Sequence, residues 1–223
     1  MSTFAKILIM KRLLAILFII AALLVAAWKL GFIFKKEDKP AAPKPEGLVV
    51  SKHSAGFNES MKVTMDSYYE LAESLVNWDT ARTTSLLSQF KTSVDSLQIQ
   101  EMQKDSAIYP TVESQWESIR SEIVGMQLDS SLYEKRVAFN SLSQMLFDLL
   151  RIVKYDAAKV YYHECPMALS NYESSAFWLS TNGEMEQRRN PYLGLYDPKY
   201  GRSMLKCGNT RDSISFVSAT EGK

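Results

Sequence analysis

One long apolar run opens the chain. Residues 13–28 hold sixteen positions without a charge, and the run extends to residue 34 with Lys29 as its only charged position. A membrane-spanning helix needs roughly 20 apolar residues, and a lysine near its end can reach the headgroups. A cleavable signal peptide has a shorter apolar core and a small-residue cleavage site, which the Ala-Ala-Trp of residues 26–28 matches poorly. The pattern favours an uncleaved transmembrane signal anchor over residues 13–34, with cleavage as the alternative.

The regions beside this run are basic and polar. Lysine and arginine residues flank both ends, so the positive-inside rule does not fix the orientation. We take residues 1–12 as cytoplasmic, because the cysteines and methionines of the body then lie in the periplasm. Residues 35–47 carry three prolines and mixed charge, which predicts a semi-rigid linker. The body, residues 48–223, is thus predicted to stand in the periplasm on a single-pass inner-membrane anchor.

Apolar positions in the first part of the body recur at helical spacing. The pattern predicts four amphipathic helices, over residues 57–78, 79–97, 112–126 and 131–153. Asp79 is a candidate N-cap, and Ser131 with Glu134 matches a capping box. In the last helix the predicted apolar stripe is Tyr133, Val137, Phe139, Leu142, Leu146, Leu149 and Val153. Short connections between such helices indicate an up-and-down four-helix bundle, a mainly α fold.

After Lys159 the pattern of residues changes from one typical of helices to one typical of strands. Strands are predicted at residues 160–165, 176–179 and 214–217, with turn residues between them. The sequence therefore predicts a small C-terminal β- and turn-rich module that contains both cysteines.

The charge balance divides the chain into two parts. Overall 26 Lys+Arg stand against 25 Asp+Glu, which argues against a nucleic-acid binder driven by positive charge. Residues 1–46 hold eight basic and three acidic groups, whereas residues 47–223 hold eighteen and twenty-two. No phosphate-binding glycine loop, nucleophile elbow or His-Glu-x-x-His motif occurs, so we do not expect an enzyme.

Two sulfur-rich clusters carry the candidate chemistry. Cys165 and Met167 flank a proline, and Met204 lies three residues before Cys207. Thiolate and thioether ligands select Cu(I) or similar soft ions, and His163 could add an imidazole. An alternative is a Cys165–Cys207 disulfide that closes a loop of about forty residues. Spacing alone favours the disulfide over metal ligation, with unpaired structural thiols as the third possibility.

Ordered short motifs resemble a known family. They are Cys165-Pro166-Met167-Ala168, Phe177-Trp178-Leu179-Ser180, Arg189-Asn190-Pro191-Tyr192 with Gly194, and Met204-Leu205-Lys206-Cys207-Gly208, preceded by Arg136, Phe139 and Ser143 in the last helix. Together they resemble family 3347 of the domains of unknown function over roughly residues 57–216. The chain departs from the family pattern at residues 169–175, which lack glycine, and at residues 195–202, which form an insertion.

The resemblance implies a setting in metal homeostasis. Domains of this family also occur appended to CusB-type periplasmic adaptors of heavy-metal efflux pumps, which implies handling of copper or silver. This implication raises soft-metal ligation to parity with the disulfide. The first hypothesis is thus a membrane-anchored periplasmic protein that binds Cu(I) or Ag(I) through Cys165, Met167, Met204, Cys207 and His163, with an efflux adaptor as partner. The second is a disulfide-stapled domain that scaffolds other envelope proteins without metal.

Overall fold

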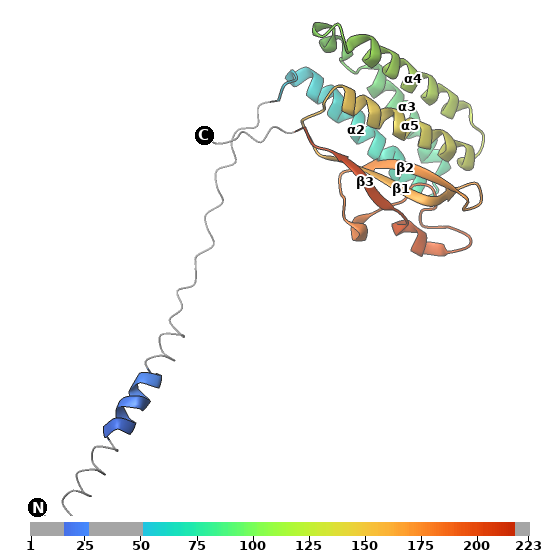
Figure 1. The fold of residues 1–223 in the computed structure, drawn as a ribbon. Coiled ribbons are helices and arrows are strands. Elements are labelled where there is room, and N and C mark those ends of the chain that lie inside the picture. Colours follow the sequence, from blue (N-terminus) through green and yellow to red (C-terminus); the bar gives the residue numbers. More distant parts are fainter. Residues whose placement is uncertain (1–15, 27–50, 217–223) are drawn as a thin grey trace, which may run out of the picture. The chain divides into compact units, whose positions relative to one another are not determined.

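The computed structural model describes residues 16–26 and 51–216 of the chain (Figure 1). Residues 16–26 are helical. No helix in these two stretches has the length and hydropathy that a membrane crossing requires. Of the predicted anchor at 13–34 only this short helix is described, and the predicted N-terminus (1–12) and linker (35–47) lie outside the described residues.

Residues 51–216 belong to one compact unit built from a helical bundle and a small sheet. The bundle helices are α2 (Ala55–Val76), α3 (Thr80–Asp95), α4 (Tyr109–Leu128) and α5 (Leu132–Ile152), and helices consecutive in sequence are neighbours in space (Figure 1). A short 3₁₀ helix, η1 (Ile99–Lys104), lies between the second and third predicted helices. The prediction of a mainly helical body is confirmed.

Both predicted N-caps are present. The Asp79 side chain accepts a hydrogen bond from the backbone N–H of Arg82 at 2.9 Å. Ser131 and Glu134 form the reciprocal capping box, in which each side chain accepts from the other's backbone N–H at 3.0–3.1 Å. Such caps satisfy N–H groups that the first helical turn leaves without partners, so they fix where α3 and α5 begin.

The predicted stripe of α5 is wrong at its first two positions. Tyr133 and Val137 are 51% and 42% exposed, whereas the stripe is buried from Phe139 onward. Residues two apart on a helix lie about 200° apart around its axis, so Val137 and Phe139 cannot share a face. Lys135 and Arg136 are buried instead, because their long side chains reach backbone carbonyl groups.

The C-terminal sheet has the strand order β2-β1-β3, and both pairs are antiparallel. Its strands are β1 (Val160–Leu169), β2 (Ser174–Ser180) and β3 (Asn209–Ile214). The first two predicted strands are confirmed, but the third lies earlier than the predicted 214–217. β3 is a polar edge strand with all but its last residue exposed, so it carries no alternation of apolar residues that the sequence could reveal.

The outer edge of β2 docks on the bundle. The backbone N–H of Phe177 donates to Asn140 Oδ1 at 2.8 Å, and that of Leu179 donates to the Tyr68 hydroxyl at 3.0 Å. Side chains from α5 and α2 thus cover backbone donors that an edge strand leaves open. This docking makes the sheet and the bundle one packed body.

Candidate functional site

A disulfide joins the two sulfur clusters. Cys165 is fully buried on β1, opposite Ala176, and Cys207 follows the 3₁₀ helix η3 (Gly201–Lys206). Their sulfur atoms are 2.22 Å apart and their Cα atoms 5.5 Å apart. The two distant segments therefore meet, and they meet as a covalent bond between β1 and the start of β3.

The glycine after Cys207 makes this close approach possible. Gly208 has a φ of +115°, and a Cβ atom there would lie 2.3 Å from the carbonyl oxygen of Glu164. Any other residue would be strained and would collide with β1. The Cys-Gly pair is therefore explained by the path of the chain beside β1.

His163 is buried and both of its ring nitrogens have partners. Nε2 lies 2.7 Å from Ser180 Oγ and 3.1 Å from the carbonyl oxygen of Asn182. Nδ1 lies 3.1 Å from Thr210 Oγ1. Burial, and secondarily the positive charge of Arg188, lowers the pKa of His163 to about 4. The imidazole is thus neutral at pH 7 and links β1 to β2 and β3.

The lowered pKa of His163 predicts a loss of stability in mild acid. The unfolded chain takes up this proton near pH 6.5, whereas the folded protein resists it down to about pH 4. Stability is therefore fully present above pH 6.5 and falls as the pH drops toward 4. Urea unfolding is expected to show a loss of about 2–3 kcal/mol between pH 7 and pH 4.5.

A matched variant separates the effect of His163 on stability from that of Asp and Glu side chains, which also take up protons in mild acid. His163→Gln keeps a neutral polar side chain but cannot titrate, so its stability should change much less over the same pH range. Equal pH dependence of the two proteins would contradict the assignment to His163.

The two methionines occupy different surroundings. Met204 is 7% exposed and belongs to the core, and the backbone N–H of Cys207 donates to its carbonyl at 3.1 Å. The predicted turn that brings Met204 and Cys207 together is therefore present. Met167 is partly buried and lies where the pairing of β1 and β2 is irregular, after Cys165.

The donor set does not fit a soft metal ion in this oxidised form. Both sulfur atoms of the cysteines are bonded to each other, so neither is a thiolate. The His163 nitrogens are engaged, which leaves only two thioethers. Within residues 16–26 and 51–216, no group of three or more His, Cys, Asp or Glu side chains could hold a metal ion. Ligation by the five predicted residues would first require reduction of the disulfide.

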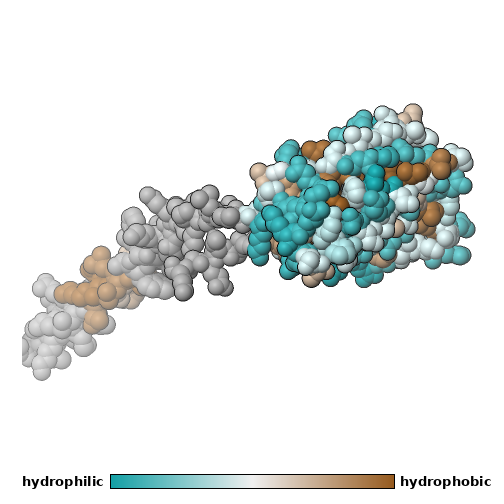
Figure 2. All heavy atoms as spheres, turned by 90° about the horizontal axis from the view of Figure 1, so that it is seen from above, coloured by the Kyte–Doolittle hydropathy of each residue, from teal (hydrophilic) through white to brown (hydrophobic). Residues whose placement is uncertain are grey.

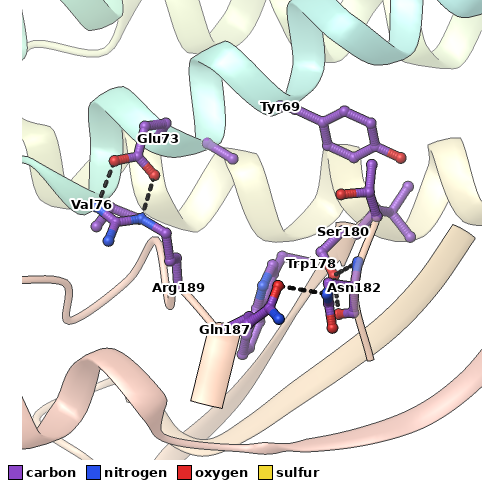
Figure 3. Close-up of a pocket in the computed structure, with 11 residues that line it drawn as sticks. Tyr69, Glu73, Val76, Trp178, Ser180, Asn182, Gln187 and Arg189 are labelled. Atoms are coloured by element: carbon purple, nitrogen blue, oxygen red, sulfur yellow. Dashed lines mark hydrogen bonds and ion pairs between the residues drawn. The ribbon is translucent and has the colours of Figure 1, made fainter. Parts of the chain in front are cut away.

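The Arg-Asn-Pro-Tyr segment holds the C-terminal module against the bundle. The backbone N–H of Asn190 donates to the carbonyl of Leu205 at 2.9 Å, and its side-chain Oδ1 accepts from the N–H of Tyr192 at 2.8 Å. The Tyr192 ring is buried, and its hydroxyl donates to the carbonyl of Phe177 on β2. Arg189 forms a two-pronged ion pair with Glu73 of α2 (Figure 3).

Gly194 and Trp78 complete the junction, by which we mean the contact between the C-terminal module and the bundle. Gly194 has a φ of +59°, and a Cβ atom there would lie 2.3 Å from the carbonyl oxygen of Val76. Trp78 Nε1 donates to the carbonyl of Leu193 at 3.0 Å, and the N–H of Leu195 donates to Val76 at 3.1 Å. The segment thus packs closely on the end of α2, which explains the glycine.

Arg136, a motif residue of the last predicted helix, is a buried charge. Its Nε donates to the carbonyl of Pro191 at 3.0 Å and its Nη2 to that of Leu75 at 2.8 Å. The guanidinium lies 4.3 Å from the centre of the Trp78 ring, and burial lowers the pKa of Arg136 to about 10. A cation at the C-terminal end of α2 is favoured by the helix dipole. Arg136 therefore ties α5, α2 and the C-terminal module together.

Phe139 and Ser143 serve the same junction. The ring of Phe139 stacks on Tyr68 with 5.0 Å between the ring centres, and Ser143 Oγ lies 2.7 Å from the Tyr68 hydroxyl. Since Tyr68 also accepts from β2, this stretch of α5 supports the sheet. The motif residues thus have structural contacts that explain their chemical identities.

The β1–β2 turn and residues 195–202 lie side by side. The Tyr172 hydroxyl, in the β1–β2 turn, donates to Asp197 Oδ2 at 2.9 Å, and its ring meets that of Tyr200 edge to face at 5.2 Å. Ser170, Asn171 and Tyr172 all have positive φ, which non-glycine residues adopt rarely and at a cost. Contacts with residues 195–202 hold this strained turn in place.

Exposed tyrosines surround this turn. Tyr133, Tyr196 and Tyr200 are 51%, 62% and 41% exposed. The backbone N–H of Ser170 donates to the Tyr133 hydroxyl at 3.2 Å, so the set continues from α5 onto the turn. We call Tyr133, Tyr172, Tyr196 and Tyr200 the tyrosine surface. Figure 2 shows that the visible face of the body is largely hydrophilic, with separate hydrophobic patches.

The described body is a helical bundle whose small C-terminal sheet is closed by a disulfide. Residues 64–157 match the model of a family described as "Protein of unknown function (DUF3347)". The predicted resemblance to that family is thereby confirmed over this segment, which runs from within α2 to just beyond α5. It includes Arg136, Phe139 and Ser143 but ends before the four C-terminal motifs. Comparisons with curated proteins and with solved structures found no significant match.

Proposed function

We propose that the body is a disulfide-stapled interaction domain that binds another envelope protein. The Cys165–Cys207 bond carries this proposal, because disulfides persist in oxidising compartments such as the periplasm. The bond also withdraws both thiolates from metal chemistry. The apolar, basic leader supports tethering of this domain to the inner membrane from the periplasmic side.

The tyrosine surface is the part of the body best suited to a partner. Tyrosine side chains bury much area at low entropic cost, and they are enriched in protein interfaces. Here the rings are held before binding, since Tyr172 is fixed by Asp197 and Tyr133 by Ser170. A cavity lined by Trp78 and by two of these tyrosines, Tyr133 and Tyr172, offers a depression for a partner's side chain. Preorganised, concave and aromatic surfaces are typical of binding hot spots.

Site-specific cross-linking in cells that carry the native protein tests the proposal. A photo-reactive residue at position 196 is expected to give one discrete adduct, whereas one at position 63 gives none. Val63 is a matched control because it is apolar, exposed at 45% and distant in sequence on α2. The double variant Tyr133→Ser, Tyr200→Ser should weaken the adduct from position 196 while the body stays folded, with only a small drop in melting temperature from the lost contacts to Ser170 and Tyr172. The same adduct from both positions, or none from either, would contradict the proposal.

Soft-metal binding by the reduced protein is the competing proposal, supported by the meeting of the two sulfur-containing segments at Cys165 and Cys207. It predicts that the reduced chain binds Cu(I) and that Cys165→Ser, Cys207→Ser abolishes this binding. Equal weak binding by both proteins would end the metal hypothesis. Mass spectrometry of unreduced protein from the cell decides which form is present.

A further inference from the structure

A second cavity, of about 440 Å³, lies beside α2 and is lined by residues with no role so far. Its walls are one face of α2, the connection from α5 to β1, and Thr181. Met65, Tyr155 and Val160 form a buried apolar floor, while Ala157 and Ala158 are exposed at the edge. Small-molecule sites are typically apolar cavities of roughly 300–1,000 Å³ with a few polar groups.

Three residues with polar side-chain groups, Asn58, Tyr69 and Tyr155, line this cavity. Asn58 Oδ1 is buried and makes no hydrogen bond. The amide orientation is fixed, because Ser51 Oγ donates to Asp156 and so can only accept from Asn58 Nδ2, at 2.8 Å. The Asn58 oxygen therefore requires a donor, and a buried acceptor without one is costly.

Two tyrosine hydroxyls supply the other polar groups. Tyr69 and Tyr155 both line the cavity. Burial raises the pKa of each, so both remain neutral hydroxyls that can donate or accept. Tyr69 and Thr181 also line the cavity of Figure 3, so the two hollows adjoin along α2.

The charges at the rim determine which ligands are favoured. Glu59, Lys62 and Asp66 line the same cavity from successive turns of α2. The Lys62 ammonium lies 2.6 Å from Asp66 and also attracts Glu59, so at this rim one cation faces two carboxylates. The rim thus carries one net negative charge, next to aromatic rings whose faces attract cations.

We propose that this cavity binds a small organic amine, with an apolar or aromatic body on the floor and a protonated nitrogen toward Asn58 and Glu59. The ammonium would pair with Glu59, and the partial negative charge of the buried Asn58 oxygen would favour a cation nearby without bonding it directly. The body would cover Met65, Tyr155 and Val160. This site shares no residue with the tyrosine surface, so its test is independent of the test of the proposed interaction function.

Binding of phenethylamine to the full-length chain, followed by ligand-observed NMR, tests the proposal. Saturable binding is expected, about fivefold tighter than that of the neutral analogue 2-phenylethanol. Glu59→Gln should remove this preference and leave the alcohol unaffected. Tyr155→Phe, which keeps the ring, should weaken the amine about three- to tenfold through the lost hydroxyl.

A blocking variant shows whether the cavity is the site. Ala158→Phe adds a ring at the exposed edge and should weaken phenethylamine more than tenfold, whereas Ala107→Phe, at an exposed position outside the cavity, should have no effect. Absence of saturable binding, equal binding of amine and alcohol, or equal binding by Ala158→Phe and the native chain would each overturn the proposal. Thermal melting of every variant identifies any that fails to fold.

Discussion

Replacement of both cysteines, Cys165→Ala with Cys207→Ala, is expected to lower the free energy of unfolding by about 4 kcal/mol. The bond spans 42 residues, and a cross-link across a loop of this length removes much entropy from the unfolded chain. The bond also holds Cys207, two residues before β3 begins, against β1. The expected loss is a large fraction of the 5–15 kcal/mol that is typical of whole domains.

Urea unfolding of the full-length chain measures this loss. The reduced native protein should resemble the double variant, since both lack the cross-link. Addition of Cu(I) to the oxidised native protein should leave its unfolding midpoint unchanged. A double variant as stable as the oxidised protein would show that the bridge constrains nothing of consequence.

Trp178→Ala is expected to cost about 3–5 kcal/mol, the usual range for loss of a buried large aromatic side chain. Trp178 is 2% exposed on β2 and lies at the centre of the junction. Its ring meets that of Tyr192 edge to face at 6.2 Å and lies 5.1 Å from the ring of His163. Removal would leave a cavity among rigid neighbours that cannot collapse to fill it.

Thermal or urea unfolding of Trp178→Ala beside Trp116→Ala separates burial from the general effect of losing an indole. Trp116 is only partly buried on α4, although its Nε1 donates to Val94 at 2.8 Å, so its loss should cost less. Trp178→Phe should recover most of the stability. A neutral Trp178→Ala would contradict the central place given to this side chain.

Helices and their ends were predictable because their signals are local. The 3.6-residue spacing, the Asp79 cap and the Ser131–Glu134 box depend on residues a few positions apart. Burial of Trp178 was also predictable, since it lies in a β-prone apolar run. The predicted apolar stripe of α5 was wrong at Tyr133 and Val137, because these two residues lie on a different face of the helix from Phe139.

The position of β3 was not predictable from pattern. Its residues are polar and exposed, and they form a strand only because the disulfide and Gly208 bring them beside β1. The burial of Lys135 and Arg136 was equally unpredictable from the sequence pattern. Their acceptors are carbonyl groups at helix ends and in the Pro191 turn, and the distance in sequence to the latter is large.

The sequence by itself determined which segments are helical, where their caps lie, and that two sulfur clusters could meet. These properties follow from local spacing and residue chemistry. Only the tertiary structure decided that the cysteines bond to each other, that His163 has no free nitrogen, and that Asn58, Tyr69 and Tyr155 share one cavity. Such pairings depend on how distant segments pack, because the partners of a buried polar group are set by the fold and not by its neighbours in sequence.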